Sequence, residues 1–200
     1  MSRPLLALLY LIAYFALTFG LRTWLSLRDT GDSGFRGVSG GFPSRIGGVL
    51  FVLAILLALA APVAELLGLL APLFEPSAEL VELGEGVILL GALLTFIAQL
   101  DMGAAWRIGV RRGEQTELVV SGAFRLVRNP IFSAMFVTCV GMALVTPNCL
   151  ALAAGACLWL GVELQVRLVE EPHLLELHGD AYRTYAARVG RFIPGLGLFR

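Results

Sequence analysis

Five long apolar runs constrain the fold of this chain more than any other feature of its sequence. The hydrocarbon core of a bilayer is about 30 Å thick, and a helix of about 20 mostly apolar residues crosses it. Hydrophobic residues make up 58% of the 200 residues, whereas a soluble domain is about half apolar. The runs are approximately residues 5–21, 46–70, 80–100, 130–145 and 149–169. We therefore predict an all-α, polytopic membrane protein with about five transmembrane helices.

Prolines mark several boundaries of these predicted helices. Pro62 is expected to kink the second helix, and Pro130 suits the first position of the fourth. Pro147-Asn148 predicts a tight turn, so the last two spans should form an antiparallel hairpin. The first run follows only Arg3 and precedes no small-residue cleavage site, which favours a retained helix over a signal peptide.

The arginines give the predicted helices an orientation. All 15 basic residues are arginine, and they gather in the segments 22–45, 101–129 and 167–200. The loops near 73–79 and 147–148 contain none. The positive-inside rule then places the N-terminus outside and the C-terminus in the cytoplasm, with only Arg3 in disagreement. The segment 30–44, rich in Gly and Ser, predicts a flexible connector on the cytoplasmic side.

Composition and spacing exclude several classes of protein. The formal net charge is zero, so nothing favours a nucleic-acid partner. With two histidines and no CxxC, we predict no metal site and read the cysteines as apolar packing residues. Three glycines of the third span do not fit GxGxxG, and no strand precedes them, so a Rossmann domain is rejected. The cysteines are Cys139, Cys149 and Cys157, the histidines are His173 and His178, and the glycines of the third span are Gly84, Gly86 and Gly91.

The segment after the fifth span predicts two short cytoplasmic helices. Pro172 should break the fifth helix and start a short helix from Pro172 to His178, with Gly179 as its stop. Asp180 suits the N-cap of a second helix over residues 181–189. The apolar positions 182, 185 and 189 recur at helical spacing, so we expect this face to pack on the membrane surface or on the domain.

A charged stripe lies at the end of the fifth span. Glu163, Arg167 and Glu170 are spaced i, i+4, i+7 and share one helical face. Ionisable residues inside a membrane span are functional candidates. With Glu171 beside them, they predict a polar pocket at the inner leaflet for a zwitterionic or cationic ligand. The alternative is an ordinary i,i+4 ion pair between Glu163 and Arg167.

Two other glutamates lie in or near the spans. Glu85, in the third helix, is either a polar packing residue near the outer interface or a functional group. Glu65, near the outer end of the second helix, is expected to be solvated.

The stretch ELVVSGAFRLVRNPIF, residues 117–132, leads into the fourth helix. Ser121-Gly122 predicts a turn that exposes backbone donors. Arg128-Asn129-Pro130 opens a helix whose free N–H groups and partial positive charge suit an anionic group such as a carboxylate. The alternative is anchoring, in which Arg128 reaches lipid phosphate and Asn129 merely caps the helix.

A series of short motifs runs from about residue 100 to residue 195, around the predicted hairpin. They are MGAAWRIGV (102–110), Leu118-Val119, Gly122-Ala123-Phe124, Arg128-Asn129-Pro130-Ile131-Phe132, Glu170-Glu171, His178-Gly179, Tyr182, Tyr185, Arg191 and Pro194. Each motif is weak alone, but their order resembles the isoprenylcysteine carboxyl methyltransferase family of integral membrane methyltransferases, especially its bacterial members. The resemblance divides the chain into an N-terminal three-helix membrane region, residues 1–100, and a methyltransferase core, residues 101–200.

This resemblance implies S-adenosylmethionine as methyl donor, bound on the cytoplasmic side of a bacterial inner membrane. The substrate residue that the family carries just before its Glu pair corresponds to Arg167, and Glu171 is the candidate base for an amine acceptor. By position, the resemblance implies that the cofactor site comprises Leu118, Val119, Gly122, Phe124, Arg128, Asn129, Pro130, Phe132, Glu170 and Tyr182.

The chain departs from the family pattern at three positions. Asn129 replaces a histidine, and Phe124 and Phe132 replace tyrosines. Asparagine keeps hydrogen bonding but cannot carry a proton at neutral pH. Cofactor binding is compatible with these changes, whereas a base at position 129 is not.

The expected acceptor is lipophilic, with a carboxylate that needs no general base. The alternatives are a phospholipid-type amine acceptor, an NADPH-dependent reductase of the membrane sterol-reductase type, and a non-enzymatic scaffold.

Overall fold

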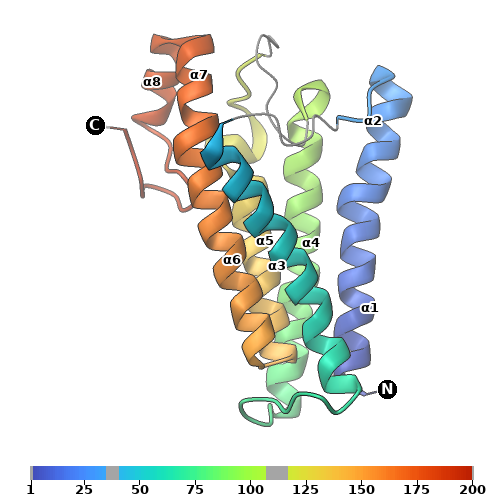
Figure 1. The fold of residues 1–200 in the computed structure, drawn as a ribbon. Helices are drawn as coiled ribbons and strands as arrows, with labels where there is room; N and C mark the ends of the chain where they lie inside the picture. The colour runs from blue at the N-terminus through green and yellow to red at the C-terminus, as the bar shows by residue number, and fades with distance from the viewer. Residues whose placement is uncertain (1, 35–40, 107–116, 200) are drawn as a thin grey trace.

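The computed structural model describes residues 2–34, 41–106 and 117–199, which form a bundle of long helices with shorter helices at one end (Figure 1). Residues 35–40 of the predicted connector and 107–110 of the MGAAWRIGV stretch lie outside this range. Across the described part of the chain there is no strand, only an isolated bridge between Val127 and Gly190. The all-α prediction is confirmed. The α-helices are α1 (Arg3–Phe15), α2 (Arg22–Thr30), α3 (Phe42–Leu66), α4 (Ala78–Asp101), α5 (Pro130–Val145), α6 (Cys149–Gln165), α7 (Glu171–His178) and α8 (Asp180–Ala186).

Four helical segments are long and apolar enough to cross a membrane: Arg3–Thr30, Phe42–Leu66, Ala78–Asp101 and Cys149–His178. Helix α5 is apolar but has only 16 residues, or about 24 Å. Many of the large apolar side chains on these helices point outward, such as Val49 and Trp159, which are 66% and 52% exposed. The chain is therefore an integral membrane protein, and its described residues form four full-length apolar helices and one shorter one.

Two predicted boundaries are wrong, and a π-helical turn explains each. The first span does not end near Leu21, because the π-helical segment Ala16–Leu21 carries it on into α2. Pro172 does not break the fifth span, because the π-helical segment Val166–Glu170 leads from α6 directly into α7, where Pro172 occupies the first turn. A proline in the first turn of a helix removes no intrahelical hydrogen bond.

The other predicted boundaries agree more closely with the structure. Helix α5 begins at Pro130, and α6 follows after the turn at Pro147-Asn148. Helix α3 continues through Pro62 to Leu66. Helix α8 is shorter than expected, and Asp180 is its first residue while Gly179, with φ of 53°, takes the cap position.

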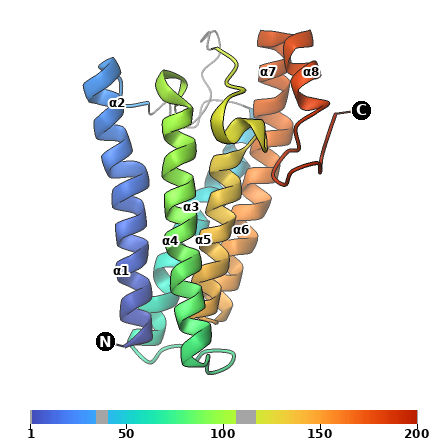
Figure 2. The same ribbon diagram turned by 180° about the vertical axis from the view of Figure 1, so that it is seen from behind.

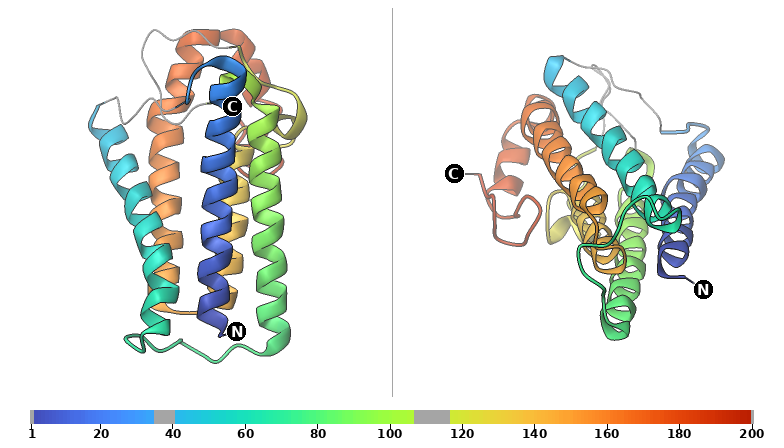
Figure 3. Two further views of the ribbon diagram at one scale, coloured as in Figure 1. Left: turned by 90° about the vertical axis from the view of Figure 1, so that its right-hand side faces the viewer. Right: turned by 60° about the horizontal axis from the view of Figure 1, so that its bottom comes forward.

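Glycines set the spacing of the helices. Helix α4 packs along α5 (Figure 2), and a Cβ atom added to Gly91 would lie 2.3 Å from the Thr138 Oγ1 atom. Helix α3 packs along α6 in the same way, with Gly47 and Gly161 facing each other. Helix α1 lies against α3 and α4 on one side of the bundle (Figure 3). The glycines of α4 thus allow close helix contact.

A polar cluster ties the helix ends together where the N-terminus lies. Arg3 forms an ion pair with Glu65 (3.2 Å) and donates to the Val145 carbonyl oxygen (2.7 Å). Asn148 Nδ2 donates to Glu65 Oε1 at 2.7 Å. The prediction that Glu65 is solvated is wrong, because its side chain is only 3% exposed. Glu85 accepts a hydrogen bond from the Tyr10 hydroxyl (3.4 Å).

Candidate active site

A cavity lies at the opposite, arginine-rich end of the bundle. It is bounded by the end of α4, the segment 117–129, α7 and α8. The empty space between its walls is about 530 Å³, its open mouth included. Its lining residues are Met102, Ala105, Glu117, Leu118, Val119, Phe124, Arg128, Asn129, Glu170, Glu171, Leu174, Tyr182 and Tyr185.

Glu171 is the centre of a buried ion cluster beside this cavity. Its Oε1 atom accepts from Arg128 Nη2 at 2.7 Å and from Arg191 Nε at 2.8 Å, and its Oε2 atom accepts from Arg191 Nη2 at 2.8 Å. The side chains of Glu171, Arg128 and Arg191 are only 6%, 2% and 12% exposed. Charge-assisted hydrogen bonds of this kind are strong. The bonds to Glu171 raise the pKa of Arg191 above its ordinary value.

Arg128 also holds the segment that follows α8. It donates to the carbonyl oxygens of Ala186 and Val189 through Nη1, and to that of Gly197 through Nη2. Its guanidinium carbon lies 5.1 Å from the centre of the Phe199 ring. The alternative in which Arg128 reaches out to lipid phosphate is wrong, because the side chain is buried. Its Nε atom is also buried, and no atom of the described residues accepts a hydrogen bond from it.

The start of α5 is joined to the same segment by Asn129 and Ser133. The Asn129 backbone N–H and its Nδ2 atom both donate to the Arg191 carbonyl oxygen, at 3.0 and 3.2 Å. Ser133 Oγ donates to the Phe192 carbonyl oxygen at 2.7 Å. The Asn129 side chain makes no N-cap hydrogen bond, so the interpretation of Asn129 as a simple helix cap is wrong.

The π-helical turn Val166–Glu170 separates the members of the predicted charged stripe. A π turn is wider than an α turn and displaces the residues that follow it. Glu170 lines the cavity, whereas Arg167 pairs with Glu163 through Nε and Oε2 and is 54% exposed. Arg167 is not among the residues that line the cavity. The geometry thus matches the ordinary i,i+4 pair that the sequence left open.

Gly122 brings the segment 117–129 against the end of α4. Its φ is +56°, and an added Cβ atom would lie 2.3 Å from the Asp101 Oδ2 atom. That oxygen accepts a hydrogen bond from the Ala123 backbone N–H at 2.8 Å. The turn at Ser121-Gly122 is present, but Asp101 takes the Ala123 donor that we expected to be exposed.

Two tyrosines of α8 complete the wall of the cavity. Tyr182 is 1% exposed, and burial raises its pKa above the ordinary range. The Tyr185 hydroxyl donates to the Phe124 carbonyl oxygen at 2.6 Å, and burial raises the pKa of Tyr185 to about 12. The apolar face of α8 therefore packs on the domain, the second of the two predicted surfaces.

Most of the residues proposed for the cofactor lie around one cavity. Leu118, Val119, Phe124, Arg128, Asn129, Glu170 and Tyr182 line it, together with Glu171. Gly122, Pro130, Phe132 and Arg167 are not in its lining, and Phe132 instead packs against the apolar core.

Sequence reasoning missed other members of the wall. Met102 and Ala105 belong to the MGAAWRIGV stretch, and Tyr185 belongs to the tyrosine motif, so a signal was present. Leu174 has no such signal. Arg191 was part of the motif series without an assigned role, although it holds Glu171. Across the described residues, no group of three or more His, Cys, Asp or Glu side chains could hold a metal ion.

Comparison with known proteins concerns the same region of the chain. Residues 80–181, from α4 into α8, match the family model described as phospholipid methyltransferase. A nickel-cobalt-cadmium resistance protein, NccN, from Alcaligenes xylosoxydans xylosoxydans is 31% identical over 114 residues, which cover 54% of this chain and 53% of that protein. A protein-S-isoprenylcysteine O-methyltransferase B from Arabidopsis thaliana is 29% identical over 114 residues, which cover 56% and 57%. The chain spans just over half the length of these curated relatives.

Proposed function

This chain belongs to the phospholipid methyltransferase family, and we propose that it is a membrane methyltransferase that methylates a lipophilic acceptor with S-adenosylmethionine at the cytoplasmic leaflet. The observation that carries this proposal is the cavity at the arginine-rich end, which gathers Leu118, Val119, Phe124 and Glu170 from distant parts of the sequence. The reductase and scaffold alternatives lose their support, because the family is one of methyltransferases.

The chemistry of the cavity fits S-adenosylmethionine. Leu118, Val119 and Phe124 offer apolar surface for the adenosine part of the cofactor, and they exclude water from the reacting atoms. Glu117 and Glu170 place carboxylates at the wall, where negative charge favours a cationic ligand. The buried Arg128 Nε atom lacks a partner within the described part of the chain, and an anionic group of the ligand would satisfy it. When bound, the cofactor supplies a methyl group on a positively charged sulfur.

Glu171 serves this reaction as a positioning residue. Both of its oxygens already accept hydrogen bonds from Arg128 and Arg191, and a carboxylate held by two guanidinium groups is a weak base. It fixes α7, and with it the neighbouring Glu170, against the start of α5. Proximity and orientation then supply much of the rate.

A second cavity supports a lipophilic acceptor. It lies between α1, α3, α5 and α6, and its empty space, open mouth included, is about 580 Å³. Its largely apolar walls include Leu11, Phe51, Met135 and Leu158. Met135 is five residues beyond Pro130 at the start of α5, which corresponds to a depth of about 8 Å. In this proposal the hydrocarbon chain of the acceptor lies along these apolar walls, and its polar end lies near Asn129. We propose that this polar end is a carboxylate of an isoprenoid- or lipid-like molecule, which is O-methylated.

An amine acceptor is the second candidate, and the phospholipid methyltransferase description of the matched family favours it. An amine must lose a proton before it can attack, so this reaction needs a base. Glu171 is engaged by two arginines, and Glu117 and Glu170 are the other carboxylates in the cavity wall. We propose one of these two as the base. With an amine acceptor, replacement of the base among these carboxylates should abolish turnover. With a carboxyl acceptor, the same replacement should only weaken cofactor binding.

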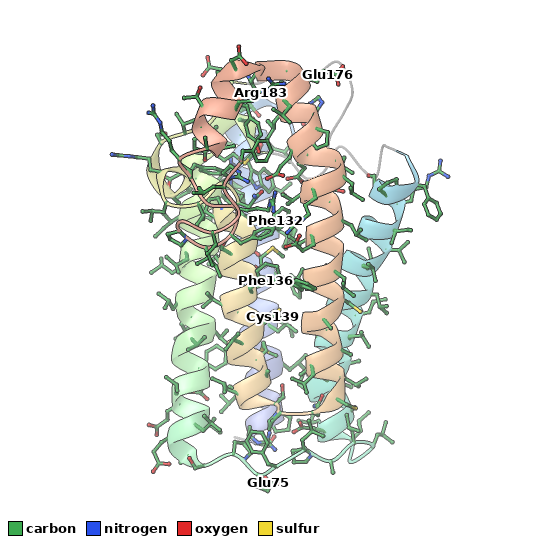
Figure 4. The ribbon with its side chains drawn as sticks, turned by 90° about the vertical axis from the view of Figure 1, so that its left-hand side faces the viewer. Glu75, Phe132, Phe136, Cys139, Glu176 and Arg183 are labelled. Atoms are coloured by element: carbon green, nitrogen blue, oxygen red, sulfur yellow. The ribbon has the colours of Figure 1, made fainter. Side chains whose placement is uncertain are left out.

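The test is binding of S-adenosylmethionine and S-adenosylhomocysteine to detergent-solubilised protein, measured by calorimetry. We expect Glu170→Gln to weaken binding of the sulfonium cofactor about tenfold or more, because a charge-assisted contact contributes about 1.5–3 kcal/mol. Glu176→Gln is the matched control, since Glu176 lies on α7, which directly follows Glu170, is exposed and points away from the bundle (Figure 4). Absence of cofactor binding by the folded wild-type protein would refute the proposal. With binding established, transfer of labelled methyl groups to carboxylated and to amine-bearing lipids separates the two acceptors.

A further inference from the structure

The segment Phe192–Phe199, here called the tail loop, carries no charged residue. It follows α8 and runs back beside the ends of α5 and α6 (Figure 1). Its two ends, Phe192 and Phe199, are half-buried, whereas residues 193–198 are exposed. Among the exposed residues are three large apolar side chains: Ile193 is 58% exposed, Leu196 is 60% exposed and Leu198 is 39% exposed. Such a patch on an ordered loop needs a partner that replaces water.

Contacts with α5 fix the depth of the tail loop. The rings of Phe192 and Phe136 meet edge to face with centroids 5.8 Å apart. Phe136 is six residues beyond Pro130, or about 9 Å along α5. The loop descends to the level of the labelled Phe132 and Phe136 (Figure 4). Helix α5 is about 24 Å long, which is less than the hydrocarbon core of about 30 Å. If the start of α5 lies at one interface, Phe136 is about 9 Å below it. If the other end of α5 lies at the opposite interface, Phe136 is deeper still, so in both cases it lies in the hydrocarbon.

Four backbone carbonyl oxygens of the tail loop accept hydrogen bonds from within the protein. Irregular backbone is tolerated at membrane depth only where protein satisfies its polar groups. The carbonyl oxygen of Phe192 accepts from Ser133 Oγ, and that of Gly197 accepts from Arg128 Nη2. The carbonyl oxygen of Ile193 accepts from the Leu196 N–H, and that of Leu196 from the Arg191 N–H.

We propose that the tail loop is inserted into the leaflet on the arginine-rich side, with Ile193, Leu196 and Leu198 in contact with lipid acyl chains. The ion cluster of Arg128, Glu171 and Arg191 then lies just above the inserted part. Two of its members, Arg128 and Arg191, donate hydrogen bonds to the carbonyl oxygens of Gly197 and Leu196 in the loop. The tail loop is thus a contact with the membrane in addition to those made by the spanning helices. This inference rests on the depth of α5 and holds whatever acceptor is methylated.

The test places a fluorescent probe on a single cysteine at Leu196 in lipid nanodiscs, in a protein whose Cys139, Cys149 and Cys157 are replaced by alanine. Quenching is compared between nitroxide-labelled lipids and an aqueous ion. Arg183→Cys is the water-exposed control, because its side chain on α8 is 71% exposed. Leu160→Cys, on the outer face of α6 and 47% exposed, is the lipid-exposed control.

We expect the Leu196 probe to be quenched by lipid several-fold more than the Arg183 probe, and to resist the aqueous quencher as the Leu160 probe does. Ile193→Cys should give the same result, which guards against a local effect at one position. Quenching of both loop probes by the aqueous ion, to the level of the Arg183 probe, would overturn the proposal and place the loop in water. Shielding from both quenchers would also overturn it and would indicate a protein partner.

Discussion

Replacement of Glu171 by glutamine should release the segment that follows α8. The wild-type carboxylate is 6% exposed and compensates the buried charges of Arg128 and Arg191. Glutamine keeps the size of the side chain but leaves both guanidinium groups without a counter-charge at this position. Loss of one partner from a buried ion pair costs about 3–5 kcal/mol. Because each 1.4 kcal/mol is a factor of ten, the open population of the segment should rise roughly a hundredfold to a few thousandfold.

Limited trypsin digestion measures this opening directly, because trypsin cleaves after arginine and the segment contains Arg188 and Arg191. When opening is fast relative to cleavage, the cleavage rate follows the open population. The spanning helices are protected by detergent or lipid, so cleavage reports the local change.

Glu163→Gln is the matched control for this experiment. It removes the same kind of charge from the same long helical segment, but its partner Arg167 is 54% exposed. A surface pair of this kind contributes about 0–1 kcal/mol, so cleavage after Arg188 and Arg191 should change less than about fivefold. Cleavage of both variants at the wild-type rate would refute the inference that Glu171, through Arg128 and Arg191, holds this segment in place.

Three further predictions concern packing, the charged stripe and pH. Gly91→Ala should lower the free energy of unfolding by about 1–3 kcal/mol through overpacking against α5, whereas Gly86→Ala, with nothing within 4 Å of its added Cβ atom, should not; thermal unfolding in detergent compares them. Arg167→Ala should keep methyl-transfer activity within about fivefold of wild type, because only a half-exposed pair is lost, and a hundredfold fall would restore its predicted role in orienting the acceptor. Tyr185→Phe should lose about 1 kcal/mol with the hydrogen bond to Phe124. Since the folded pKa of Tyr185 is about 12 and exceeds its ordinary value of 10.0, its contribution to wild-type stability is complete below pH 10 and is lost toward pH 12. Alkaline unfolding of the variant should lack that component.

The hairpin of α5 and α6 shows what local sequence can determine. Pro130 sets the start of α5 because its fixed φ suits the first helical position, and Asn148 starts α6 by accepting a hydrogen bond from the Ala151 backbone N–H at 2.9 Å. Both signals act within one turn of the chain. The predicted boundaries of this hairpin therefore agree with the structure.

The charged residues show where local reasoning stops. Arg128, Glu171 and Arg191 are 43 and 20 residues apart in sequence, and no periodicity connects them. Similarly, Glu65 was expected to be solvated because its partners Arg3 and Asn148 approach only when α1, α3 and the hairpin pack together. A pattern within one helix cannot show which distant charge will compensate a carboxylate.

By itself, the sequence determined the spanning helices, the hairpin and the family, because the bilayer requires long apolar runs and the family motifs follow one another in a fixed order. Only the tertiary structure decided that the π-helical turn before α7 turns Glu170 into the cavity and leaves Arg167 outside it. It also decided that Arg128 binds the tail loop instead of lipid phosphate. The physical reason is that the free energy of a buried charge depends on the partners that packing brings to it, and these partners come from remote parts of the chain.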